Sequence, residues 1–376
     1  MAPRIRRWRP RSPRTDSIGR KSARGGLFAV NANLFTPMGS MRLALQAMTR
    51  VLSGVQPTGD VHLGNYLGAF RNWVQDQRKA DAFYCIVDLH ALTVDHDPSV
   101  LASRTLDMAT ILLATGLDPE SCTLFVQSHV AEHTGLTWIL ECTATMGELN
   151  RMTQFKDKGR GNESVKVGLF TYPVLMASDI LLYDADRVPV GDDQRQHLEL
   201  ARDIAIRFNG RYGETFTVPQ AAIPSVGARV MDLQDPTSKM SKSASSPQGT
   251  ILLLDEPSVI TKKIKRAVTD AGSEVLYDPS TKPGVSNLLE LLAAATGSAP
   301  QDCAKHYGSY GPLKADTAEA VIEMVLPVQE RYRELSSDPG TLAKILANGA
   351  SKARSVARPT LARASSAVGL LSQGDA

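Results

Sequence analysis

The segment VLSGVQPTGDVHLGN, residues 51–65, decides the class of fold. Its first five residues are apolar or small and lead into QPTGD, which is rich in turn-forming residues, so the segment predicts a short buried strand followed by a loop. Within residues 63–79, Leu67, Phe70 and Val74 recur at helical spacing and predict a helix. A strand, a loop and a helix in this order form the first unit of a parallel α/β sheet.

The same alternation continues along the chain. Residues 99–115 predict a second helix, and further buried strands are predicted at 82–87, 123–126 and 188–191. Short apolar strands that alternate with helices favour a parallel sheet with both faces covered. Beyond about residue 250 only helices follow, at 259–268, 287–295, 315–335 and 342–368, which indicates a helical bundle.

The composition is that of an ordinary globular protein. Of the 376 residues, 43% are apolar and 22% are charged, which excludes collagen-like and wholly disordered chains. No apolar stretch approaches the roughly 18 residues of a membrane span, so we expect no membrane partner. Residues 1–50 contain eleven Lys and Arg residues and one acid, although the net charge of the chain is only +3. The rest of the chain is therefore mildly acidic, and any nucleic-acid surface on it must be a local patch.

Residues 1–47 are expected to form a disordered basic extension. They are rich in Arg, Pro, Ser and Gly and show no helical or strand period. Three interpretations stay open: a targeting segment, a nucleic-acid-binding arm, or sequence upstream of a later start at Met38, Met41 or Met48. We assign the extension no function.

The four cysteines, Cys85, Cys122, Cys142 and Cys303, are far apart and form no Cys-x-x-Cys pair. This spacing argues against a thiolate zinc site. We expect four buried thiols in a reducing compartment and no metal site built from the protein's own side chains.

Two segments carry candidate chemistry. The first segment, residues 56–65, joins the first strand to its helix, at the edge of a parallel sheet where ligands bind. Gly59 and Gly64 let the backbone approach a ligand closely, and His62 and Asn65 can donate hydrogen bonds to a phosphate, His62 from both ring nitrogens when it is protonated. The alternative is a plain loop with a surface histidine and a capping asparagine, which local chemistry alone favours.

The second segment, residues 236–243, reads PTSKMSKS. Its two lysines, Lys239 and Lys242, are three residues apart and interleaved with hydroxyl groups. A lysine is a compact point charge that can follow a moving phosphate. The alternative is a solvated loop with two surface lysines.

Together, the two segments resemble the paired signatures of class I aminoacyl-tRNA synthetases, His-x-Gly-(His or Asn) and Lys-Met-Ser-Lys-Ser. The second signature is complete, from Lys239 to Ser243, and the first has Asn65 as its last residue. Longer blocks are similar to bacterial tryptophanyl-tRNA synthetases, and the resemblance runs from about residue 50 to near the C-terminus. These blocks are SGVQPTG at 53–59, GELNRMTQFK at 147–156, YPVLMASDILLY at 172–183, VPVGDDQ at 188–194 and KIKRAVTD at 263–270.

The resemblance implies a fold and a function. It implies an α/β, doubly wound, Rossmann-like nucleotide-binding domain at residues 48–246 and an α-helical tRNA anticodon-binding domain at residues 247–376. The implied activity is the ATP-dependent attachment of L-tryptophan to tRNA(Trp) through tryptophanyl-adenylate, with release of AMP and pyrophosphate. Mg²⁺ is expected with ATP, held mainly by phosphates and water, and the protein is expected to be a cytoplasmic homodimer.

The resemblance also implies roles for particular residues. His62, Asn65, Lys239, Lys242 and Ser243 are the expected catalytic residues. The expected ATP-binding residues are Gln56, Pro57, Thr58, Gly64, Asn65, Gly191, Asp192, Asp193, Val230, Lys239, Met240, Ser241, Lys242 and Ser243. The expected tryptophan-binding residues are Asp179, Met176, Tyr172, Gln154 and His90. Outside these sets, the cluster Lys262, Lys263, Lys265 and Arg266 is a candidate contact for tRNA phosphates.

Asp179 is the expected reader of the indole ring. The only polar group of a tryptophan side chain is a donor-only N–H, which a buried carboxylate can accept. Asp179 lies between the apolar runs 174–176 and 180–182, which argues against the alternative of a solvated or capping aspartate. With phenylalanine bound, the carboxylate would have no partner, at a cost of about 1–3 kcal/mol. This corresponds to a discrimination against phenylalanine of ~5- to 150-fold. For His90 the alternative is a structural histidine, and for Tyr172 and Gln154 it is ordinary polar packing.

Two other functions stay open. A tyrosine-specific relative of the same fold would need a second polar reader for the phenol. A non-catalytic paralogue could bind tRNA or a protein partner, although pure binding needs no complete Lys-Met-Ser-Lys-Ser loop.

Overall fold

The computed structural model describes residues 49–158, 164–189, 191, 194–222, 230–241 and 246–371. Residues Ala47–Ala376 group into one compact unit. The expected basic extension, residues 1–47, lies outside the described residues.

The sheet has five parallel strands in the order β3-β2-β1-β4-β5. β1 and β2 pair in register from Arg50 opposite Asp81 to Val55 opposite Ile86. The α/β, doubly wound, Rossmann-like class of fold is therefore confirmed, together with all four predicted strands. β5 was not predicted, because Gln-Ala-Ala contains no β-branched or aromatic residue. The strands are β1 Arg50–Val55, β2 Asp81–Ile86, β3 Thr123–Val126, β4 Arg187–Pro189 and β5 Gln220–Ala222.

The predicted helices are present, with ends within a few residues of those expected. One of them is composite: residues 63–76 form a short α-helix, a π-helical turn and a second α-helix, with Leu67, Phe70 and Trp73 buried. The α-helices are α1 Leu63–Asn65, α2 Arg71–Asp76, α3 Asp88–Ala91, α4 Pro98–Ala114, α5 Glu132–Glu141, α6 Met146–Leu149, α7 Thr153–Lys158, α8 Val167–Leu181, α9 Arg195–Tyr212, α10 Pro257–Lys265, α11 Pro283–Thr296, α12 Pro300–Ala304, α13 Tyr310–Ser336 and α14 Pro339–Ala367. The other helical turns are η1 Tyr66–Phe70, η2 Gln127–His129 and η4 Pro247–Gly249.

Alternate side chains of β2 enter two separate cores, one on each face of the sheet. Tyr84 and Ile86 join a core that includes residues of α4, α11 and α13. Phe83 and Cys85 join a core that includes residues of α5, α8 and α9. Both faces are thus covered, which leaves the ends of the strands as the place where a ligand can meet the sheet.

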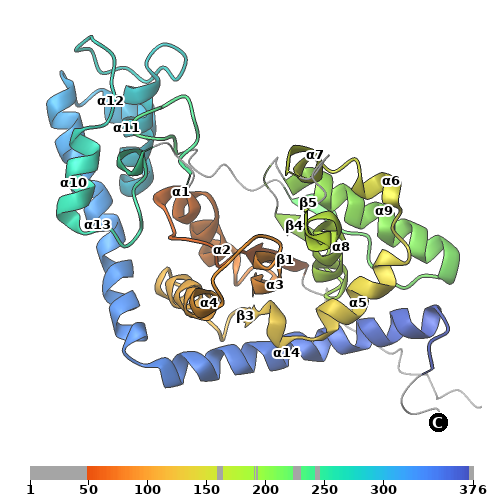
Figure 1. Cartoon of the computed structure of the whole chain (residues 1–376). Coiled ribbons are helices and arrows are strands. Elements are labelled where there is room, and N and C mark those ends of the chain that lie inside the picture. Colours follow the sequence, from red (N-terminus) through yellow and green to blue (C-terminus); the bar gives the residue numbers. More distant parts are fainter. Residues whose placement is uncertain are drawn as a thin grey trace, which may run out of the picture. The chain divides into compact units, whose positions relative to one another are not determined.

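The last predicted helix differs from expectation in what it packs against. α10, α11, α12 and α13 form the expected bundle, but α14 lies along β3 and α5 (Figure 1). Small residues allow this close approach: a side chain at Gly349 would collide with the carbonyl oxygen of Leu124, and Ala350, Ala353 and Ala357 are buried in the core beneath the helix. Periodicity predicts the helix but not the surface that it covers.

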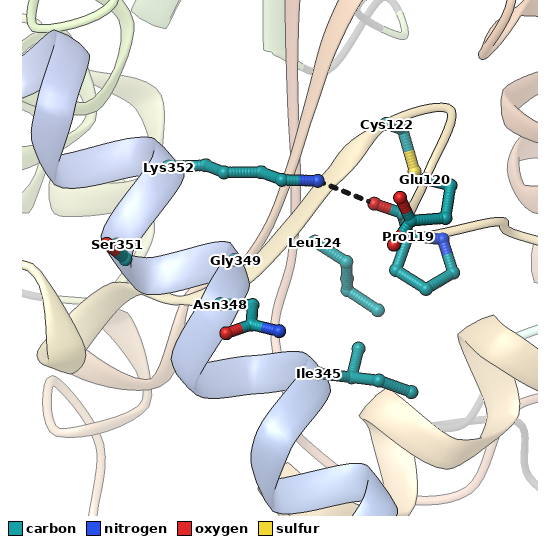
Figure 2. A pocket seen from close by; sticks show the side chains of 9 residues that line it. All are labelled: Pro119, Glu120, Cys122, Leu124, Ile345, Asn348, Gly349, Ser351 and Lys352. Atoms are coloured by element: carbon teal, nitrogen blue, oxygen red, sulfur yellow. Dashed lines mark hydrogen bonds between the residues drawn. The ribbon is translucent and has the colours of Figure 1, made fainter.

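A cavity of about 280 Å³ remains between α14 and β3 (Figure 2). Lys352 reaches across one end of it, and its Nζ donates a hydrogen bond to the carbonyl oxygen of Pro119 at 2.9 Å. Cys122 lies on the opposite wall, where burial raises the pKa of its thiol to about 12. This hydrogen bond from Lys352 supplements the close packing of small residues that holds α14 against the sheet.

The cysteines are free thiols, as expected. Cys85, Cys122 and Cys303 are buried, but Cys142 is exposed, so the prediction that all four are buried is wrong. Cys142 caps the carboxyl end of α5, and a single small residue at a helix end carries no periodic signal of its burial. Among the described residues, no helix has both the length and the apolar character needed to span a membrane.

Candidate active site

The first segment leaves the carboxyl end of β1 and turns into α1. Gly59 adopts a left-handed backbone conformation with φ of +67°, which glycine accepts without strain. His62 is the N-cap of α1, and its Nδ1 accepts a hydrogen bond from the backbone N–H of Asn65 at 3.3 Å. In return, Oδ1 of Asn65 accepts a hydrogen bond from the backbone N–H of His62 at 3.2 Å. This reciprocal pair fixes both side chains at the start of the helix.

The capping pair changes what His62 can do. Its ring is buried rather than at the surface, and a side chain at Gly64 would press on it, with a Cβ only 3.0 Å from Nδ1. Because Nδ1 accepts this hydrogen bond, it cannot also donate one to a phosphate while the cap is formed. The expectation of two donors is therefore wrong for the structure as it stands, whereas the amide group of Asn65 keeps its two N–H donors.

The second segment begins in a tight turn that Asp235 closes. Its carboxylate accepts hydrogen bonds from the hydroxyl groups of Thr237 and Ser238, both at 2.6 Å, and these bonds lower its pKa. Beyond the turn, Lys239 is exposed. Met240 is buried, and its N–H donates to the carbonyl oxygen of Val230 at 3.1 Å. The turn thus presents Lys239 to solvent on a rigid base, while Lys242 and Ser243 lie outside the described residues.

The first and second segments meet each other. A Cβ at Gly64 would lie 3.8 Å from the Cβ of Met240. The backbone of His62 also pairs with that of Leu252, just beyond the second segment. The structure therefore brings together His62, Gly64, Asn65 and Met240, which the sequence separates by about 175 residues.

Asp179 lies on α8, where 4% of its surface is exposed, as its apolar neighbours predict. Its Oδ1 accepts hydrogen bonds from Nε2 of Gln127 at 2.7 Å and from Nδ1 of His133 at 2.6 Å. Its Oδ2 accepts one from Nε2 of His90 at 2.8 Å. Burial raises the pKa of this carboxyl group, but the hydrogen bonds from His133 and His90 outweigh burial and hold the pKa well below its usual range. Asp179 is therefore an ionised acceptor with capacity left on Oδ2.

The ionised carboxylate of Asp179 fixes the tautomer of His133, because it can only accept a hydrogen bond from Nδ1. Burial raises the pKa of Tyr183 far above its usual range, so its hydroxyl group is neutral. That hydroxyl group lies 2.8 Å from Nε2 of His133 and can donate to it. Nδ1 of His133 carries the proton that it donates to Asp179.

Three strands bring these groups to one edge of the sheet. The first segment follows β1, His90 lies just beyond β2 on α3, and Gln127 directly follows β3. Because the strands are parallel, their carboxyl ends lie at the same edge, where an open α/β sheet binds its ligand. The hydrogen bonds from His90 and Gln127 hold Asp179 at that edge.

Of the other predicted tryptophan-binding residues, Tyr172 and Met176 lie near this carboxylate, whereas Gln154 forms no hydrogen bond with it in the described part of the chain. The ring of Tyr172 meets that of His90 edge-on, with 6.2 Å between ring centres, and its hydroxyl group lies 2.6 Å from Nε2 of His197. Met176 is half-buried one turn before Asp179 on α8. Gln154 is half-buried on α7, and it is not among the described residues that hydrogen-bond Asp179.

The remaining predicted ATP-binding residues are partly described. Pro57 is buried, Thr58 is half-buried and Gln56 is exposed. Gly191 accepts a backbone hydrogen bond from Gln194 at 3.0 Å, whereas Asp192 and Asp193 lie outside the described residues.

Residues 45–325 match the family described as tRNA synthetases class I (W and Y). The chain belongs to this family. A tryptophan–tRNA ligase from Streptomyces coelicolor is 58% identical over 330 residues, which make up 86% of this chain and 98% of that relative. The crystal structure of tryptophanyl-tRNA synthetase from Mycoplasma pneumoniae superposes with a TM-score of 0.79 at 38% identity, covering 87% of this chain and 99% of that one.

The crystal structure of tryptophanyl-tRNA synthetase from Campylobacter jejuni, complexed with ADP and tryptophan, superposes with a TM-score of 0.74 at 37% identity. The match covers 86% of this chain and 100% of that one. These similarities confirm the resemblance to bacterial tryptophanyl-tRNA synthetases that the longer sequence blocks indicate.

Three residues that join this candidate site were not predicted from sequence: Gln127, His133 and Tyr183. Gln127 had a usable signal, because a polar residue that directly follows a buried strand lies at the ligand edge of the sheet. His133 has no such signal. It lies in α5 and is fully buried, and its contact with Asp179 spans 46 residues of sequence.

One predicted tRNA contact is wrong. Lys263 is 7% exposed, and its Nζ lies 2.7 Å from Oδ2 of Asp255, so it cannot reach an external phosphate. Helical spacing explains the error, because Lys263 shares a face of α10 with the buried residues Ile260 and Ile264. Lys262, Lys265 and Arg266 are exposed.

Proposed function

We propose that this chain attaches L-tryptophan to tRNA(Trp) in two steps. The carboxylate of tryptophan attacks the α-phosphorus of ATP, and the bond to the departing pyrophosphate breaks, which leaves tryptophanyl-adenylate. A ribose hydroxyl group at the end of the tRNA then attacks the carbonyl carbon of the adenylate, and AMP departs. The observation that carries the proposal is the buried, ionised carboxylate of Asp179, which lies at the same sheet edge as the first segment.

Tryptophan would bind with its indole N–H directed at Oδ2 of Asp179. A carboxylate held by three protein donors keeps its position and its charge, so it accepts the N–H without rearranging. The thioether of Met176 suits contact with an aromatic ring. Tyr172, Gln154 and His90 would complete the pocket, with Tyr172 and Gln154 toward the ammonium and carboxylate groups of the amino acid.

ATP would lie between the first and second segments. The amide group of Asn65 and Nε2 of His62 offer hydrogen-bond donors to its phosphates. Lys239 and Lys242 would neutralise charge as it moves onto the pyrophosphate, which lowers the barrier more than it tightens ground-state binding. The proposed ATP contacts are Gln56, Pro57, Thr58, Gly64, Asn65, Gly191, Asp192, Asp193, Val230, Lys239, Met240, Ser241, Lys242 and Ser243.

Mg²⁺ would accompany the nucleotide. The donors of the second segment are two lysines and several hydroxyl groups, which fit phosphate oxygens better than they fit a bare cation. We therefore propose that phosphates and water hold the ion, as is usual for Mg²⁺ with nucleotides. When bound, the ion neutralises phosphate charge and orients the leaving group.

The tRNA would contact both parts of the chain. We propose that residues 48–246 carry the chemistry and that residues 247–376 read the anticodon. Lys262, Lys265 and Arg266 are exposed on and just beyond α10 and are suited to phosphate contacts. Translation and the free thiols fit a reducing, cytoplasmic setting.

We also propose that the protein is a homodimer, joined through an apolar face beside the site. A cavity of about 460 Å³ opens there, lined in part by Leu92, Trp138, Tyr172 and Leu175. Trp138 is 69% exposed, and an exposed tryptophan bordering an apolar hollow is typical of an interface. Tyr172 lines this hollow and contacts both His90 and His197, so the proposed interface borders the site.

Trp138→Glu is expected to convert the dimer to a monomer, because the interface would have to bury an unpaired charge. Sedimentation equilibrium measures the change. Leu276→Glu is the matched control, since Leu276 is also exposed but lies in the loop after α10, away from this face. A monomeric wild type, or a Trp138→Glu variant that remains dimeric, would rule out this face.

The function is tested by ATP–pyrophosphate exchange with tryptophan, tyrosine and phenylalanine added separately to purified protein. We expect exchange to be fastest with tryptophan. Faster exchange with tyrosine would identify the tyrosine-specific relative instead. No exchange with any of the three would favour a non-catalytic paralogue.

A further inference from the structure

Residues 250–253, which we call the linking strand, are hydrogen-bonded to both the first and the second segment. The backbone N–H of Leu63 donates to the carbonyl oxygen of Ile251 at 2.8 Å, and the N–H of Leu253 donates to the carbonyl oxygen of Val61 at 2.8 Å. These two bonds lie on either side of His62. The first segment is thereby fastened to the linking strand at the residue that caps α1.

The other end of the linking strand holds the second segment. Oγ1 of Thr250 donates a hydrogen bond to the carbonyl oxygen of Ser241 at 3.0 Å. Thr250 is itself buried, so this bond is shielded from water. Four consecutive residues therefore join the two segments that we propose to enclose ATP.

A buried lysine fixes the linking strand from behind. Nζ of Lys263 donates to the carbonyl oxygen of Thr250 at 2.7 Å and to Oδ2 of Asp255 at 2.7 Å. The same Oδ2 accepts the backbone N–H of Leu252 at 2.9 Å. A buried ion pair satisfied in this way is costly to break from one side, so it holds Thr250 in one place.

We propose that Thr250 and Lys263 are positioning residues for adenylate formation. Neither contacts the substrates; together they set the separation between the first and second segments. This inference rests on the proposed function, because the separation between the first and second segments matters to chemistry only when ATP binds between these segments. Stabilisation of a transition state depends on donors placed in advance, and a misplacement of about 1 Å can cost about 10²-fold in rate.

The matched pair Thr250→Val and Thr250→Ser tests the hydroxyl group. Valine keeps the shape of threonine and removes the donor to Ser241, whereas serine keeps the donor. In tryptophan-dependent pyrophosphate exchange, we expect Thr250→Val to lower kcat about tenfold, with KM for tryptophan within about twofold of wild type. Thr250→Ser should retain most of kcat. Wild-type kcat in Thr250→Val, or equal losses in both variants, would overturn the inference.

Amide hydrogen exchange on the full chain without substrates gives a second readout that does not need activity. We expect the backbone amides of Leu63 and Leu253 to exchange faster in Thr250→Val than in Thr250→Ser, because the linking strand loses one of its anchors. Unchanged exchange at both amides would overturn the inference. A wild type that binds no tryptophan and exchanges no pyrophosphate would instead refute the proposed function, whatever the amides show.

Lys263 is tested together with Asp255, so that no buried charge is left alone. The double variant Lys263→Met, Asp255→Asn keeps an acceptor for the N–H of Leu252 and removes the donor to Thr250. We expect a fall in kcat at least as large as that of Thr250→Val, with KM for tryptophan again within about twofold. Thermal unfolding confirms that the variant is folded, and a folded double variant with wild-type kcat would contradict the role of Lys263.

Discussion

Asp179→Asn is expected to lower kcat/KM for tryptophan about 100-fold. Asparagine has the shape of aspartate, but it carries no charge and presents an N–H₂ group to a site already occupied by the donors of Gln127, His133 and His90. At least one buried donor then loses its acceptor, and losing a charged acceptor costs roughly twice as much as losing a neutral one. Steady-state pyrophosphate exchange measures the effect.

An analogue with sulfur in place of the indole N–H separates recognition from damage to the fold. The structure lowers the discrimination expected from sequence, because Asp179 keeps three protein donors even when the indole donor is missing. We expect wild type to prefer tryptophan over the analogue by about 5- to 10-fold through this contact, and Asp179→Asn to lose that preference. Asp88→Asn, which removes a carboxylate bonded to Ser128 at the same sheet edge, should retain it. An Asp179→Asn variant with the full preference would show that another group reads the indole.

Lys239→Ala is expected to lower kcat for adenylate formation about 100-fold while changing KM for ATP by less than about threefold. Lys239 is exposed on the rigid turn that Asp235 closes, so its charge is available to the departing pyrophosphate. An interaction that strengthens only as charge develops acts on kcat rather than on binding. Single-turnover formation of the adenylate gives the rate directly, and we expect Lys242→Ala to behave in the same way.

Lys305→Ala is the control for charge alone. Lys305 is exposed just beyond α12, where it pairs with Asp302, and its loss removes one positive charge far along the chain from the second segment. Its kcat should equal that of wild type. A raised KM for ATP with unchanged kcat in Lys239→Ala would mean that Lys239 binds ATP in the ground state only.

The parts of the fold that sequence predicts are those with a strong local pattern. β1, β2 and β3 are runs of apolar residues bounded by turns, and they appear within a residue of their expected positions. β5 is three residues of Gln and Ala and is defined by its pairing with β4. The helix α14 is predicted, but its contact with β3 depends on Gly349 meeting Leu124, a relation across 225 residues that no local pattern contains.

In the candidate site, too, sequence predicts the features that have a local pattern and misses those that depend on the fold. Burial of Asp179 follows from its apolar neighbours, because a side chain within such a run faces the core. The groups that donate hydrogen bonds to it come from α3, η2 and α5, and only the fold brings them to α8. The burial of Lys263 could have been predicted from its place on the apolar face of α10. The expectation that it contacts tRNA gave more weight to its charge than to that pattern.

A crystal structure with tryptophan and a non-hydrolysable ATP analogue tests the central claim most directly. We expect the indole nitrogen about 2.7–3.2 Å from Oδ2 of Asp179, and the phosphates between Asn65 and Lys239. An indole ring bound away from Asp179, or phosphates bound outside the two segments, would contradict the account.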